Sequence, residues 1–219
     1  MDEVPEWVVL LAGEWRLGGL REVYRAKQRA VFGKWNDWRL YFYGEGLIVA
    51  GPEGVGMPFR WETVTVFQNL RTVNGAQADA AYTLVGPELE AVTIGRGTPA
   101  QLRFTVEGRR VPSVVRGAPF VYEGTWGPEI QAQVARVRLP GAVERLRRGE
   151  ALDFGKLRIG GDGVSVKGKA LAWAEVSDVQ VGDGTLWVSD ARRRSLPTVA
   201  VAEIPNFLLA LNLLERLRG

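Results

Sequence analysis

The alternation of apolar and polar residues over positions 156–181 predicts a β-meander, in which short antiparallel strands follow one another through tight turns. Residues 39–67 show the same pattern earlier in the chain. Both stretches carry a glycine-rich turn, Gly44-Glu45-Gly46 in one and Gly161-Asp162-Gly163 in the other. The repeat predicts two related β-rich domains in tandem. The equivalent apolar positions, in chain order, are Leu40 and Leu157, Phe42 and Ile159, Val49 and Val166, Trp61 and Trp173, Val64 and Val176, and Phe67 and Val179.

The repeat places a domain boundary after Gly149, a residue type that commonly ends helices. The first domain, residues 1–149, is expected to hold an N-terminal helix and an insertion over about 95–127. This insertion has no counterpart in the second half and is expected to cross the surface. The second domain, residues 150–219, is smaller. A chain of 219 residues is long enough for each half to bury a core of its own.

An apolar stripe in the N-terminal segment predicts a short helix that begins near Pro5 and ends before Gly18. Such a stripe is typical of a helix that packs on its own domain. A short anchor at a membrane surface is the alternative interpretation, although the glutamates of this segment would be repelled by anionic lipids. The stripe consists of Val8, Leu11 and Trp15.

A second helix is predicted to begin at Pro128, because apolar residues recur after it at helical spacing. Pro140 is expected to kink or break this helix, since proline lacks the amide that a helix interior uses. Residues 203–218 predict a C-terminal helix with two apolar faces. Phe207 and Leu211 should pack in the core of the second domain. The other face is expected to meet the first domain or another subunit, because a helix apolar over most of its girth is buried on several sides.

The predicted order of about seven short antiparallel strands followed by one helix fits the pleckstrin-homology-like (PH-like) plan in both halves. The succession of the motifs GEGL, FRW, FG, LAW and IPN resembles an uncharacterised family of actinobacterial-type bacterial proteins with two tandem PH-like domains. The resemblance runs from about Leu17 onward. It implies a mainly β fold of class α+β, in which each domain is a partly open antiparallel barrel or sandwich capped by a C-terminal helix. It implies no activity, because that family has none assigned.

Cysteine and histidine are both absent from the chain. Their absence excludes disulfides, thiolate or imidazole metal ligands, cysteine nucleophiles and Ser-His-Asp triads. The turn at residues 160–163 lacks the Lys-Ser/Thr of a phosphate-binding loop and precedes a predicted strand instead of a helix. We therefore expect no cofactor, no metal and no enzymatic activity. An enzyme that relies on carboxylates alone is the third-ranked hypothesis.

The net charge of +3 permits contact with phosphates without requiring it, because the arginines are spread along the chain. No recognition helix or zinc framework accompanies them, so nucleic-acid binding is not expected. The N-terminus starts acidic and its apolar run is too short for a signal peptide. No segment approaches the ~20 apolar residues of a membrane span. These features predict a cytoplasmic protein.

Trp61 and Trp173 occupy equivalent positions of the repeat, which predicts a structural role in the core for both. The compact basic cluster of the chain is Arg192, Arg193 and Arg194, in a loop between two predicted strands. Trp187 alternates with apolar neighbours and should point to the solvent-facing side of its strand. Two interpretations of the cluster remain open. It is either a solvated loop tip or, joined by Trp187, a patch that binds lipid phosphates or an acidic partner.

The expected function is that of a non-enzymatic scaffold or adaptor that binds another protein or another copy of itself. The alternative is peripheral binding to an anionic membrane through the basic loop. Fold-level analogy guides both expectations, since no catalytic motif is present.

Overall fold

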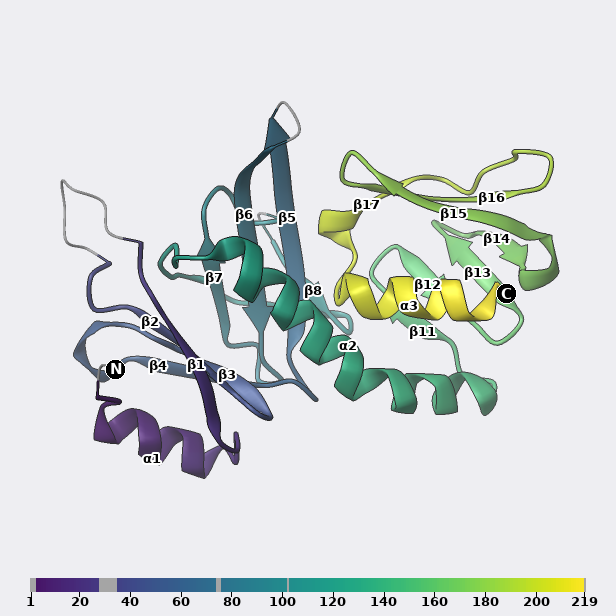
Figure 1. Ribbon diagram of the computed structural model, residues 1–219. Helices are drawn as coiled ribbons and strands as arrows, with labels where there is room; N and C mark the ends of the chain where they lie inside the picture. Colours follow the sequence, from purple (N-terminus) through teal and green to yellow (C-terminus); the bar gives the residue numbers. More distant parts are fainter. Residues whose placement is uncertain (1–2, 28–34, 74–75, 102, 219) are drawn as a thin grey trace.

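The computed structural model describes residues 3–27, 35–73, 76–101 and 103–218. Within these residues the chain is mainly β, with three α-helices and several antiparallel or mixed sheets that do not close into a barrel. Figure 1 shows two β-rich units side by side, joined by the long helix α2 (Glu123–Arg147). The fold class is therefore α+β, as the sequence predicts.

The first unit contains helix α1 (Glu6–Glu14) and two four-stranded sheets. The first sheet is an antiparallel meander of β1 (Leu20–Arg25), β2 (Arg39–Tyr43), β3 (Gly46–Ala50) and β4 (Gly56–Arg60). The second has the order β10-β7-β6-β5, formed by β5 (Thr65–Val73), β6 (Ala76–Val85), β7 (Ala91–Gly95) and β10 (Val115–Arg116). A 3-10 turn, η1 (Pro52–Gly54), and the hairpin of β8 (Thr105–Val106) and β9 (Arg109–Arg110) complete the unit.

The two faces of β2 have different partners, as strict alternation along a strand requires. Leu40 and Phe42 lie in the main core between the sheets. Tyr41 and Tyr43 lie on the other face, where α1 covers them through Val8 and its neighbours. Helix α1 therefore packs on its own unit, which is the first of the two interpretations of its apolar stripe.

The segment after β7 runs only partly over the surface, since the β8–β9 hairpin is mostly exposed but the residues that lead into α2 are buried. Its strand β10 pairs in parallel with β7, and Ala26 forms a bridge with Phe120 that ties this segment to the end of β1. Ala118, Phe120 and Trp126 are fully buried. The sequence pattern did not reveal this because prolines and glycines interrupt the apolar positions, whereas burial here depends on long-range pairing.

Helix α2 begins at Glu123, five residues before the predicted start at Pro128. Of the kink or break predicted at Pro140, the break does not occur, because the helix continues to Arg147, and Figure 1 shows that α2 changes direction along its length. Pro140 and Arg136, whose carbonyl loses its helical partner to the proline, are both exposed, so water can satisfy that carbonyl. The N-terminal half of α2 packs in the first core and the C-terminal half in the second, so packing on both sides maintains the helix.

The second unit repeats the plan with shorter strands. An antiparallel meander, β11 (Leu152–Phe154), β12 (Leu157–Ile159), β13 (Gly163–Val166) and β14 (Lys169–Ala172), leads through the 3-10 turn η2 (Trp173–Glu175). A three-stranded sheet follows, formed by β15 (Val176–Gly182), β16 (Thr185–Asp190) and β17 (Val199–Ala200). The turn η3 (Val201–Glu203) then precedes helix α3 (Phe207–Leu217). Helix α3 starts four residues later than predicted, because Asn206 adopts a left-handed conformation with φ of 50°.

Two contacts recur at equivalent places in the two units, and a third recurs with its acceptor displaced by one residue. The backbone N–H of Trp61 donates to the Glu45 carbonyl at 3.0 Å, and that of Trp173 to the Asp162 carbonyl at 3.1 Å. The indole N–H of Trp61 donates to the Gly44 carbonyl at 3.2 Å, and that of Trp173 donates to the Gly160 carbonyl, one residue before the position equivalent to Gly44, at 3.0 Å. A side chain at Gly46 or Gly163 would lie 2.2 or 2.3 Å from a strand carbonyl, so both positions need glycine. These matching contacts support the internal repeat read from the sequence.

The second apolar face of α3 is buried inside the chain. Leu209 and Leu213 are buried, and α3 packs against α2 and beside β5 of the first unit. The backbone N–H of Val66 donates to Asn206 Oδ1, and the Asn206 N–H donates back to the Val66 carbonyl, each at 2.8 Å. The predicted contact with the first domain is therefore present, and this face needs no other subunit to cover it.

Candidate functional site

The predicted basic loop is built around one buried carboxylate. Asp190, at the end of β16, accepts hydrogen bonds from the backbone N–H groups of Arg192 and Arg194 at 2.9 and 2.8 Å. Its other oxygen accepts from Arg194 Nε at 2.7 Å. Burial by itself would raise the pKa of Asp190, because it disfavours the charged carboxylate. The hydrogen bonds stabilise the charged form more strongly, so the pKa is lowered. Arg192, Arg193 and Arg194 are exposed, and one of the three positive charges is neutralised within the loop.

Trp187 and Arg193 line the same shallow hollow on the outer face of β15 and β16. The hollow measures about 520 Å³, and its other lining residues are Asp178, Gln180, Ser189 and Ser195. Trp187 is partly buried and lies opposite Gln180 in the strand pairing. The structure thus brings Trp187 together with one arginine of the loop, and the hollow is also lined by a carboxylate, an amide and two hydroxyls. Arg192 and Arg194 do not line it.

The four residues predicted for the core differ in burial. Trp61 is fully buried and Phe207 is buried, whereas Trp173 and Leu211 are partly buried against the second core. Trp173 makes hydrogen bonds of the same kind as Trp61, but its side chain is less deeply buried. None of these four residues lines the hollow beside Trp187 or the hollow at the N-terminus of α2.

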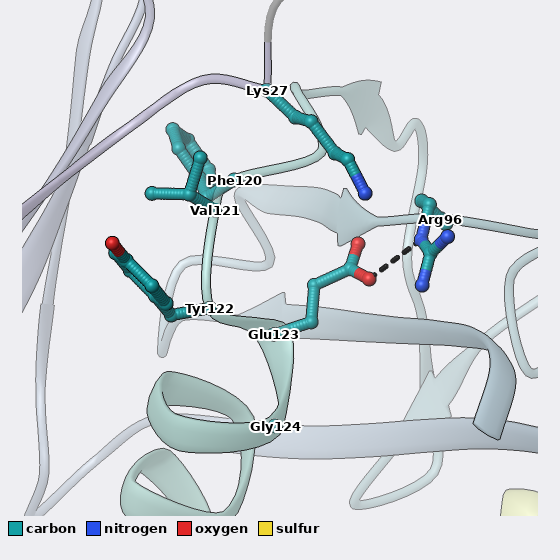
Figure 2. A pocket seen from close by; sticks show the side chains of 7 residues that line it. All are labelled: Lys27, Arg96, Phe120, Val121, Tyr122, Glu123 and Gly124. Carbon is teal, nitrogen blue, oxygen red and sulfur yellow. Dashed lines mark hydrogen bonds and ion pairs between the residues drawn. The ribbon is translucent and has the colours of Figure 1, made fainter. Parts of the chain in front are cut away.

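A second hollow lies at the N-terminus of α2, at a place that sequence reasoning did not single out. It measures about 460 Å³ and is lined by Lys27, Arg96 and residues 120–124. Figure 2 shows the Glu123 carboxylate between the Lys27 and Arg96 side chains. Arg96 Nε donates to Glu123 Oε2 at 2.7 Å, and the Glu123 side chain is only 6% exposed. The other oxygen, Oε1, is buried and accepts no hydrogen bond from any described residue.

Burial and the nearby charge of Glu123 raise the pKa of Tyr82 to about 12. Tyr82 lies beneath α2, where its ring packs edge-on against Trp126. Its hydroxyl therefore stays protonated at neutral pH and cannot act as a base. The hollow combines two cations with one carboxylate, which suits the binding of a small polar molecule. It lacks an evident nucleophile with an adjacent base.

The outer edges of the equivalent strands β5 and β15 have different neighbours. Val66 of β5 lies five residues after Trp61, and Asp178 of β15 lies five residues after Trp173. Asn206 and η3 cover the outer edge of β5 at Val66. At β15 no described strand pairs with the outer edge. An uncovered edge presents unpaired backbone groups to other chains.

The described residues contain no group of three or more acidic, histidine or cysteine side chains arranged to hold a metal ion. In the same part of the chain, no helix has both the length and the apolar character needed to cross a membrane.

Comparison with known proteins finds one match to a family model. Residues 113–218, which contain α2, the second β unit and α3, match the family described as "Family of unknown function (DUF6585)". No curated protein and no solved structure matches the chain. The matched segment begins before α2, so it includes this helix together with the strands that follow it. The resemblance to an uncharacterised family read from the sequence agrees with this match for the second half of the chain.

Sequence reasoning missed Glu123 and Asn206 for different reasons. Glu123 lies beside Lys27 and Arg96, which are far away in the sequence. No local sequence pattern indicates that these three side chains come together. Asn206 did carry a signal, because an asparagine directly before an apolar helix commonly caps it. In the structure its side chain bonds to another unit instead of its own helix, and only the tertiary arrangement determines that.

Proposed function

We propose that the protein is a non-enzymatic, self-associating cytoplasmic adaptor built from two PH-like units. In this proposal, β15 of one copy pairs antiparallel with β15 of a second copy. The observation that carries the proposal is the contrast between the covered edge of β5 and the uncovered edge of β15. The PH-like assignment is supported by the order of elements, since each unit has a four-stranded meander, a second sheet and a helix.

Among the sheet edges of the described residues, β15 is well suited to pairing. Strand β4 contains Pro58, which cannot donate to a neighbour. The edge strands β11, β14 and β17 have four residues or fewer. Strand β15 has seven residues, contains no proline or lysine, and leaves Val181 46% exposed. Proline and lysine usually protect an edge strand from pairing with another chain. Of the usual protective features, β15 has only the bulge at its start.

The sequence of β15 is compatible with pairing to itself. Antiparallel pairing centred on Val179 places Asp178 of each copy opposite Gln180 of the other, so no like charges meet. The same alignment places Ser177 opposite Val181. A two-fold axis through such a strand produces a closed dimer, the commonest symmetry of soluble oligomers.

Charge substitution at Gln180 tests this pairing, because Gln180 is exposed. Sedimentation equilibrium over a range of concentrations should show a dimer for the wild type. Gln180→Asp places like charges opposite each other twice and should weaken the dimer at least about tenfold. Adding Asp178→Lys to that variant replaces repulsion with attraction and should restore the dimer.

Ala132→Asp is the control, since it adds one negative charge on the exposed side of α2, away from β15. It should leave dimerisation unchanged. A wild type that stays monomeric at all concentrations would contradict self-association. A dimer that ignores Gln180→Asp would place the interface elsewhere.

Peripheral binding to anionic membranes is the second candidate, supported by the exposure of Arg192, Arg193 and Arg194. The ion pair of Arg194 with Asp190 leaves two of these charges for lipid phosphates. Co-sedimentation with neutral and anionic vesicles at low and high salt tests this candidate. Salt-sensitive binding to anionic vesicles, lost when all three arginines are changed to glutamate, is the supporting result.

A further inference from the structure

The hollow at the N-terminus of α2 has the features of a binding site for a small molecule. Helix α2 has 25 residues and begins at Glu123, and no side chain caps its first turn. The first N–H groups of a helix have no partner inside the helix, and the helix dipole adds positive potential at this end. The hollow at this end measures about 460 Å³. A helix start alone is not a site, and the side chains around this one supply the further features.

Glu123 is the feature that indicates a ligand. Its side chain is 6% exposed, and Arg96 satisfies only Oε2. Oε1 is buried and has no hydrogen-bond donor among the described residues. Buried carboxylate oxygens normally accept hydrogen bonds, because an unmet acceptor loses its water without compensation. In Figure 2 this carboxylate points into the space between Lys27 and Arg96. A hydrogen-bond donor on a bound molecule would satisfy it.

The charges around the hollow also indicate which charge a ligand should carry. Arg96 is paired with Glu123, whereas the exposed Lys27 ammonium has no ion-pair partner within the described residues. Lys27 and the start of α2 therefore favour a negative group. Glu123 disfavours a group with two negative charges, such as a phosphate dianion, by direct repulsion. A single carboxylate fits this balance best.

We propose that this hollow binds a small monocarboxylate whose neighbouring carbon carries an amino or hydroxyl group. Its carboxylate lies between Lys27 and the first N–H groups of α2, and its amino or hydroxyl group donates to Glu123 Oε1. This site is separate from the β15 edge and does not depend on self-association.

Three probes of equal carbon number test the proposal on the full chain: L-alanine, L-lactate and propionate. They share a carboxylate and differ only in the group on the neighbouring carbon. Isothermal titration calorimetry, supported by ligand-observed NMR, should show alanine or lactate binding about tenfold more tightly than propionate. The same measurement shows which donor, ammonium or hydroxyl, the site takes. Inorganic phosphate should bind more weakly than the preferred probe.

Two variants assign the contacts. Lys27→Ala should weaken all three carboxylates about equally, and Lys169→Ala, at an exposed lysine of the second unit, should change none of them. Glu123→Gln should remove most of the difference between the preferred probe and propionate. Lys27→Ala alone suffices if Glu123→Gln does not fold, because Lys27 lies on the surface. The proposal is overturned if neither alanine nor lactate binds, if propionate binds equally well, or if Lys27→Ala binds as the wild type does.

Discussion

The two β units of this protein share their backbone contacts but differ in how much surrounds them. In both, a tryptophan after the fourth strand of the meander donates its backbone N–H to the acidic residue of a glycine-rich turn and its indole N–H to a glycine carbonyl at or directly before that turn. Trp61 is fully buried, whereas Trp173 is only partly buried. The edge of β5 is covered by Asn206, whereas the equivalent edge of β15 has no described strand beside it. The two units thus share local backbone geometry, whereas the burial of equivalent residues depends on the elements that surround each unit.

The largest expected effect is the loss of Trp61. Trp61→Ala should lower the free energy of unfolding by about 3–5 kcal/mol, because it leaves a large cavity in the first core. Trp173→Ala should lower it by only about 1–2 kcal/mol, since part of that ring is already in contact with water. Urea unfolding followed by far-UV circular dichroism measures both. Equal losses would show that burial does not distinguish the two units.

The second expected effect concerns the covered edge of β5. Asn206→Ala should cost about 2–3 kcal/mol, because the buried Val66 N–H loses its acceptor and alanine tolerates the left-handed backbone poorly. Asn206→Gly removes the same hydrogen bond without the backbone strain and should cost less. Hydrogen exchange at the Val66 amide should become faster in both variants.

Asn69→Ala is the matched control for this prediction. Asn69 also bonds through its side chain, to Thr98, but this contact is exposed to solvent. Its loss should change stability by no more than about 0.5 kcal/mol. A loss as large as that of Asn206→Ala would mean that burial of the edge is not what matters.

The smallest expected effect is a loss of stability at high pH that arises in the first unit. All five tyrosines lie in the first 122 residues, so tyrosine ionisation acts on the first unit. The pKa of Tyr82 is about 12 in the folded chain, against about 10 unfolded. A tyrosine whose pKa is raised by folding stabilises the folded chain fully below pH 10. This stabilisation is lost as the pH rises toward 12. For Tyr82 the loss should reach about 1 kcal/mol by pH 11.

Urea unfolding at pH 9 and pH 11 measures that loss, and Tyr82→Phe should reduce it. Tyr24 and Tyr43, whose pKa values burial also raises, keep part of the pH dependence in this variant. An identical loss in the wild type and in Tyr82→Phe would mean that Tyr82 ionises as freely in the folded chain as in the unfolded one.

Much of the architecture follows from the sequence pattern. The repeat, the alternating faces of β2 and the two buried faces of α3 were all predicted from the spacing of apolar residues, because period and burial are coupled along regular elements. The same reasoning failed at the start of α2, which it placed five residues too late, and the break allowed at Pro140 does not occur because packing on both sides of α2 outweighs the local cost of proline. It also failed at Phe120 and its neighbours, where irregular backbone is buried through long-range pairing.

The candidate sites were less accessible to prediction. Trp187 and the arginine loop were identified because strand alternation and a charge cluster are local signals. The sequence did not indicate that only Arg193 shares a hollow with Trp187, since Asp190 determines the shape of the loop. The hollow at α2 gave no sequence signal at all, because Lys27, Arg96 and Glu123 come from three separate segments.

By itself the sequence determined that this chain has a repeated β-rich fold, a buried tryptophan motif and no histidine or cysteine chemistry. These properties depend on residue type and on short-range spacing, which the chain carries in every conformation. The tertiary structure alone decided which strand edge is covered, which tryptophan is fully buried and which carboxylate oxygen lacks a donor. Each of these depends on groups that are distant in sequence meeting in space, and the local pattern of residues does not encode which groups meet.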